Sequence, residues 1–156
     1  MSAVLALGSN LGDRPAQLRL AVRMLAACRV SPVYETIPVG GPAQGRYLNA
    51  VVLVPAAPPR ALLAAARAAE AAAGRVRDLQ WGPRTLDVDM IACGDLVSTD
   101  PEVVVPHPRA HERAFVLVPW HDLQPDAVLP GRGPIAALLA GLDCGGVRRT
   151  DVELAP

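Results

Sequence analysis

The chain contains no lysine, so all 15 of its basic residues are arginine. P-loop NTPases and protein kinases hold nucleotide phosphates with a lysine, and the sequence excludes both classes. Cysteine is also scarce. The three cysteines are scattered, and neither a C-x-x-C pair nor a cysteine–histidine group with zinc spacing occurs. We therefore interpret the cysteines as idle or buried thiols in a reducing compartment.

Net charge, aromatic residues and long apolar runs are lacking too. The formal net charge is +0 and aromatic residues make up 3% of the chain, which argues against a nucleic-acid partner. No apolar run has membrane-spanning length, so no membrane partner is expected. The N-terminus lacks the pattern of a signal peptide, which favours a cytoplasmic protein. With 156 residues, 51% of them hydrophobic, we expect a single domain over residues 1–156 that acts as a monomer.

Hydrophobic periodicity and turn residues predict an α+β fold. Strands are predicted at 3–7, 30–36, 47–54 and 85–92, helices at about 15–28 and 58–74, mobile loops at 37–46 and 75–83, a short extended piece at 103–105, and later helices at 110–118 and 134–140. The order β-α-β-β-α-β is that of a ferredoxin-like core, with an antiparallel sheet and both helices on one face. The last third of the chain would add elements to the other face.

An acidic pair lies on the fourth predicted strand. Because side chains alternate along a strand, Asp87 and Asp89 project to one face, while Leu86, Val88 and Met90 can pack on the helices. Neighbouring carboxylates repel each other unless a cation neutralises them, and Mg²⁺ binds one or two carboxylates together with phosphate oxygens. A solvated outer strand face explains the pair equally well when it is considered alone.

Three arginines gather just before this acidic pair. Arg75 and Arg77 precede Trp81, and Arg84 follows it. Guanidinium groups bind phosphate oxygens in pairs, so the cluster suits a metal–triphosphate ligand. Simple ion pairing between these arginines and the aspartates is the alternative.

Other groups are weaker when taken alone. His107 can donate to a phosphate and Arg113 adds positive charge, but a turn histidine and a helix-surface arginine explain them as well. Tyr47 and Asn49 share a strand face and suit a flat heteroaromatic ring, yet an ordinary strand would also contain them. Residues 8–13 are interpreted as a strand-to-helix turn.

Seven segments together resemble the 6-hydroxymethyl-7,8-dihydropterin pyrophosphokinase family. They are Leu7-Gly-Ser-Asn-Leu-Gly-Asp13, Tyr34-Glu-Thr36, Tyr47-Leu-Asn-Ala50, Gly74-Arg-Val-Arg77, Trp81-Gly-Pro-Arg-Thr-Leu-Asp-Val-Asp89, Val105-Pro-His107 and Arg113-Ala-Phe-Val-Leu117. They occur in family order over nearly the whole chain, and the segment that begins at Trp81 is the most specific.

The resemblance implies a ferredoxin-like enzyme of folate biosynthesis. It would transfer pyrophosphate from ATP, the co-substrate, to 6-hydroxymethyl-7,8-dihydropterin and release AMP. The family pattern assigns two Mg²⁺ ions to Asp87 and Asp89, catalysis to Arg75 and Arg84, ATP binding to Glu70, Arg77, Trp81, His107 and Arg113, and pterin binding to Thr36, Val39, Tyr47, Asn49 and Phe115. The rival hypothesis is a non-catalytic ferredoxin-like regulatory module that binds a nucleotide or metal.

Overall fold

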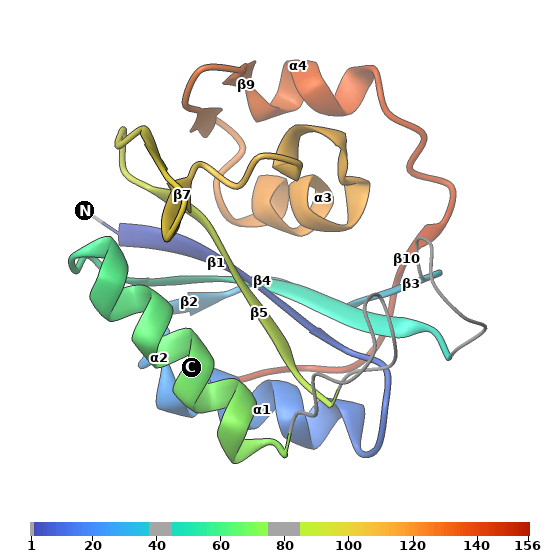
Figure 1. The fold of residues 1–156 in the computed structure, drawn as a ribbon. Coiled ribbons are helices and arrows are strands. Elements are labelled where there is room, and N and C mark those ends of the chain that lie inside the picture. Colours follow the sequence, from blue (N-terminus) through green and yellow to red (C-terminus); the bar gives the residue numbers. More distant parts are fainter. Residues whose placement is uncertain (1, 38–44, 75–84) are drawn as a thin grey trace.

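A six-stranded antiparallel sheet forms the centre of the protein (Figure 1). The computed structural model describes residues 2–37, 45–74 and 85–156. The sheet has the order β10-β3-β4-β1-β5, and β2 also pairs with β4. Its strands are β1 (Ser2–Ser9), β2 (Arg29–Val30), β3 (Tyr34–Thr36), β4 (Tyr47–Pro55), β5 (Asp87–Cys93) and β10 (Val147–Arg149).

Helices cover both faces of this sheet (Figure 1). The helices α1 (Arg14–Met24) and α2 (Pro59–Ala72) lie on one face, while α3 (Ala114–Leu123) and α4 (Ile135–Ala140) lie on the other. The remaining elements are the 3₁₀ turn η1 (Ala110–Glu112) and two small sheets, formed by β6 (Ser98–Asp100) with β7 (Val103–Val105) and by β8 (Val128–Leu129) with β9 (Gly133–Pro134). Within the described ranges, no helix is both long and apolar enough to cross a membrane.

Each face of the sheet has its own hydrophobic core, because side chains alternate along the strands. Leu5 and Leu7 of β1 pack with α1 and α2 in the first core. Val4 of the same strand packs with Leu117 and Trp120 of α3 in the second core. A strand that is buried on both sides needs apolar residues at successive positions, which explains the continuous apolar run in β1.

Predicted and observed bounds differ by up to two residues for most elements, and by more for two elements in the first third of the chain. The helix predicted to reach residue 28 ends at Met24, because the chain leaves the helix through Ala26, which has a φ of 52°. The strand predicted at 30–36 is divided into β2 and β3, and Pro32 lies in the gap, where it has no N–H to donate. Ser31 bridges this gap, since its hydroxyl oxygen accepts a hydrogen bond of 2.9 Å from the Val51 N–H.

The helix predicted at 110–118 is in fact η1 followed by α3. The two are separated by Arg113, whose backbone is extended with a φ of −109° and a ψ of 98°. The prediction also missed β6, β8, β9 and β10, which are too short to show a clear pattern. Most of the two predicted mobile loops, at 38–44 and 75–83, lies outside the described residues.

Candidate active site

One row of cross-strand neighbours crosses the whole sheet. Gly8 of β1 pairs with Asp87 on one side and with Asn49 on the other. Asn49 in turn pairs with Tyr34, and Tyr34 pairs with Arg149 of β10. Directly opposed residues point to the same face, which here is the face that α3 covers. The row therefore joins an acidic end to a basic end across one surface.

The acidic pair has the orientation that alternation predicted. Leu86, Val88 and Met90 are buried in the core that α1 and α2 share, so Asp87 and Asp89 face the α3 side. Arg113 Nη1 lies 3.8 Å from Asp89 Oδ2 on that side.

The donor set of this pair fits Mg²⁺. Both carboxylates are partly exposed on a strand whose backbone is fixed by pairing with β1. Within the described ranges, no cluster of three or more His, Cys, Asp or Glu side chains could hold a metal ion. An ion bound here would take its other ligands from phosphate oxygens and water, which is how Mg²⁺ is usually held.

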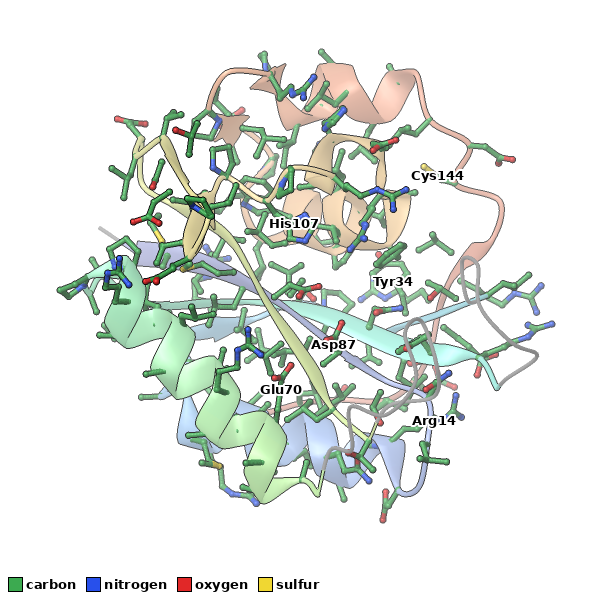
Figure 2. All side chains as sticks on the ribbon, in the orientation of Figure 1. Arg14, Tyr34, Glu70, Asp87, His107 and Cys144 are labelled. Atoms are coloured by element: carbon green, nitrogen blue, oxygen red, sulfur yellow. The ribbon has the colours of Figure 1, made fainter. Side chains whose placement is uncertain are left out.

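Glu70 supports the acidic pair from the opposite face (Figure 2). Its side chain is 3% exposed, and its Oε2 accepts a hydrogen bond of 3.0 Å from the backbone N–H of Val88. Val88 lies between the two aspartates, so the bond fixes the peptide that carries them. Figure 2 shows Glu70 on the α2 side and His107 on the α3 side, with Asp87 between them. The predicted contact between Glu70 and the nucleotide stays a prediction.

His107 is held as a neutral ring with a defined donor. Its Nδ1 accepts a hydrogen bond of 3.1 Å from the Arg109 N–H, so the ring proton is assigned to Nε2. Burial of the ring, followed by the positive charge of Arg113, lowers the pKa of His107 to about 4. The negative charge of Asp87 acts on the pKa of His107 in the opposite direction.

The lowered pKa of His107 predicts a pH dependence of stability. The folded protein binds a proton at His107 more weakly than the unfolded chain does. The contribution of neutral His107 to the free energy of unfolding is therefore complete above the unfolded pKa of about 6.5. It should be lost as the pH falls from there towards 4. NMR titration of the imidazole, with urea unfolding at several pH values, tests this. The variant His107→Gln should flatten the pH dependence over that range, and an NMR midpoint near 6.5 would contradict the prediction.

The amide of Asn49 is held in one orientation. Its Nδ2 donates a hydrogen bond of 2.5 Å to Thr36 Oγ1, and both residues are buried. A Cβ atom added at Gly8 would lie 2.9 Å from Asn49 Oδ1 and 3.3 Å from Cδ1 of Tyr47. The absence of a side chain at Gly8 therefore leaves room for the amide and the tyrosine ring.

Arg113 connects the acidic pair to an aromatic side chain. Besides its ion pair with Asp89, its guanidinium carbon lies 5.5 Å from the centre of the Phe115 ring, a cation–π distance. Phe115 is in the first turn of α3, which packs over the sheet.

The structure thus brings two predicted groups to one face. One group is Asp87, Asp89, His107 and Arg113, and the other is Thr36, Tyr47, Asn49 and Phe115. Val39, Arg75, Arg77, Trp81 and Arg84 lie outside the described residues. Gly8 was not among the predicted site residues, although a glycine within a strand often marks a close approach of a ligand or another part of the chain.

These features define a class of site. A carboxylate pair, a neutral imidazole donor and an arginine suit a metal-bound chain of phosphates, and the buried amide beside a tyrosine suits a flat heterocycle. Such a combination is typical of an enzyme that transfers a phosphorus group to a heterocyclic substrate.

The chain belongs to the family of 7,8-dihydro-6-hydroxymethylpterin-pyrophosphokinase (HPPK), whose sequence model matches residues 4–125. A 2-amino-4-hydroxy-6-hydroxymethyldihydropteridine pyrophosphokinase of Mycobacterium tuberculosis is 47% identical, over 90% of this chain and 83% of the relative. The protein of the same name in Methylorubrum extorquens is 42% identical, over 96% of this chain and 98% of the relative.

The fold has a match among solved structures. The Plasmodium falciparum HPPK-DHPS A437G structure with SDX-DHP superposes with a TM-score of 0.69 at 13% sequence identity. The match covers 89% of this chain but 45% of that chain, so this protein corresponds to less than half of it. At that identity the likeness concerns the fold alone.

Proposed function

We propose that this protein transfers pyrophosphate from ATP to 6-hydroxymethyl-7,8-dihydropterin, giving the pterin pyrophosphate and AMP, in folate biosynthesis. One observation carries the proposal: Asp87 and Asn49 are the two cross-strand neighbours of Gly8. A phosphate chain at the carboxylates and a pterin at the amide would therefore meet over β1. Family membership supports the same reaction.

Asp87 and Asp89 would hold Mg²⁺, with two ions expected from the family pattern. When bound, Mg²⁺ neutralises phosphate charge and orients the phosphate chain. Glu70 keeps the carboxylate-bearing peptide in place through its bond to Val88. Arg113 lies close enough to Asp89 to exchange that contact for one with a phosphate oxygen.

The remaining nucleotide contacts are assigned to arginine, tryptophan and histidine side chains. His107 would donate a hydrogen bond from its Nε2–H to a phosphate oxygen. Because the ring is neutral, it acts as a hydrogen-bond donor and not as a general acid. Arg75 and Arg84 would stabilise the charge that develops during transfer, while Arg77 and Trp81 would bind ATP. The family pattern supports these four assignments.

The pterin would bind between the sheet and α3. Asn49 would read the ring edge from its fixed orientation beside Thr36, and Val39 would complete the wall. Tyr47 and Phe115 would hold the ring between their aromatic planes, an arrangement that flat rings favour. Phe115 is already positioned by the Arg113 guanidinium.

Transfer then follows from positioning. The hydroxymethyl oxygen of the pterin attacks the β-phosphorus of ATP, the bond from that phosphorus to the α-phosphate oxygen breaks, and AMP leaves. Such transfers depend mainly on alignment and on neutralising the phosphate charges; the arginines supply positive charge here, and the neutral His107 supplies a hydrogen bond. The substrate hydroxyl proton passes to solvent as the new bond forms.

We also propose that the chain is a single ferredoxin-like domain over residues 1–156, active as a monomer in the cytoplasm. The order β3-β4-β1-β5, with α1 and α2 on one face, supports the ferredoxin-like class. The position of the site within one sheet supports activity without a second subunit.

The nucleotide product tests the proposed function. With ATP, Mg²⁺ and the pterin, we expect AMP to form in a one-to-one ratio with the pterin pyrophosphate, because the β- and γ-phosphates leave together. Chromatography of the nucleotides and ³¹P NMR of the pterin product measure both. Omission of the pterin controls for contaminating ATPases, and ADP as the stoichiometric product would refute the assignment.

A further inference from the structure

Tyr34 has no part in the reaction described above, yet it ties the sheet to α3. Its side chain is buried, and its hydroxyl donates a hydrogen bond to Asp122 Oδ2 on that helix. Burial and, after it, this hydrogen bond raise the pKa of Tyr34 to about 12. The phenol therefore keeps its proton throughout the physiological pH range and remains the donor of the bond.

The position of Tyr34 on the sheet is next to the residues proposed to read the pterin. Tyr34 is the direct cross-strand neighbour of Asn49, on the side away from Gly8. Opposed side chains on one face have Cβ atoms about 5 Å apart, so the ring of Tyr34 borders the amide. Thr36, which holds Asn49 Nδ2, lies two residues further along the same strand face. Figure 2 shows Tyr34 between the sheet and α3.

The helix at the other end of this bond carries the opposite wall of the pocket. Phe115 is in the first turn of α3 and Asp122 is near its end, about 10 Å further along a rigid helix. Leu117 and Trp120, which lie between them, are buried against the sheet. The hydrogen bond from Tyr34 to Asp122 therefore also constrains the distance of Phe115 from β3 and β4.

We propose that Tyr34 and Asp122 form a positioning pair that sets the width of the pterin pocket between Asn49 and Phe115. Neither residue contacts the reacting atoms. The pair acts by holding α3 at a fixed height over β3, and by bounding the Asn49 amide on the side opposite Gly8. This inference rests on the proposed function, since it concerns the pterin subsite.

The test separates positioning from general stability. We would compare Tyr34→Phe, Asp122→Ala and the double variant, with Asp122→Asn as the conservative change that still accepts the hydrogen bond. Gln124→Ala is the matched control, because it removes a 3.0 Å side-chain bond to Trp120 on the same helix without touching β3. Calorimetry would give the Kd of 6-hydroxymethylpterin and of a non-hydrolysable ATP analogue with Mg²⁺, and thermal unfolding would give the Tm.

Tyr34→Phe and Asp122→Ala should each weaken pterin binding about fivefold, as expected for loss of one net hydrogen bond. The double variant should be no weaker than the stronger single change, because both remove the same bond. Asp122→Asn and Gln124→Ala should keep the Kd for the pterin within about twofold of wild type. Every variant should keep the Kd for the ATP analogue within the same range. KM for the pterin should rise while kcat at saturation changes little.

Unchanged pterin binding in Tyr34→Phe, with an active wild-type enzyme, would overturn the inference and leave the proposed function intact. Equal weakening of ATP and pterin in proportion to Tm would also overturn it, since that is the result of a structural role alone. If Asp122→Ala fails to fold, the conservative pair Tyr34→Phe and Asp122→Asn decides. A wild-type protein that binds no pterin and forms no AMP would refute the function and the inference together.

Discussion

Replacing Asp89 with alanine should lower the single-turnover rate by about a hundredfold or more at ordinary Mg²⁺ concentrations. The carboxylate lies on a strand held by β1 on one side and, through the Val88 peptide, by Glu70 beneath it. The backbone at Asp89 is therefore held in place by pairing on one side and by Glu70 near Val88. The ion loses one of its few protein ligands, so higher Mg²⁺ should restore part of the rate.

Single-turnover kinetics across a Mg²⁺ titration measures this effect. Asp95→Ala is the matched control, because it removes the same charge just beyond the far end of β5, away from the proposed site. The control should behave as wild type. An Asp89→Ala enzyme that keeps its rate and its Mg²⁺ requirement would contradict the assignment of Asp89 to the metal.

Replacing Gly8 with alanine should weaken pterin binding by about tenfold or more while sparing ATP. The new methyl carbon would lie 2.9 Å from Asn49 Oδ1, so the amide must leave the orientation that Thr36 fixes. If the Asn49 amide is displaced, polar groups of the bound pterin lose their hydrogen-bond partner, which costs roughly 1–3 kcal/mol. The same loss of pterin affinity is expected for Asn49→Ala, which removes the amide itself.

The two changes should not add, because both act on one amide. In the Asn49→Ala background, the oxygen that the methyl group would meet is gone, so Gly8→Ala should cost little more. Gly146→Ala is the control, since a Cβ there meets nothing within 4 Å. Calorimetry with the pterin and with an ATP analogue reports both affinities, and an equal loss of both ligands in Gly8→Ala would place its effect outside the pterin subsite.

The parts of the fold that the sequence predicts are those that carry a strong local pattern. The strand predicted at 47–54 corresponds to β4 at Tyr47–Pro55, because eight successive residues suit a strand with two buried faces. The opposite orientation of the aspartates and of Val88 follows from alternation alone, and it is confirmed.

The parts that the sequence does not predict depend on register or on long-range contacts. Nothing in the chain near Gly8 indicates that its neighbours are Asn49 and Asp87, which are set by pairings across the sheet. Arg113 interrupts a pattern that favours a continuous helix, and its side chain meets Asp89 and Phe115 where it does so. The strand β10 has three residues, two of them arginine, so no hydrophobic alternation marks it.

The row from Asp87 to Arg149 has an electrical consequence. The strand positions at its two ends, which carry residues of opposite charge, are about 19 Å apart, which is four strand spacings. When no Mg²⁺ is bound at the carboxylates, a ring between the two ends lies in an electric field directed along the row, from the guanidinium towards the carboxylates. A flat heterocycle with unevenly distributed charge has different energies in its two end-to-end orientations within such a field. In the metal-free protein we therefore expect the electron-rich ring edge to be favoured towards Arg149 and the hydroxymethyl group towards Asp87.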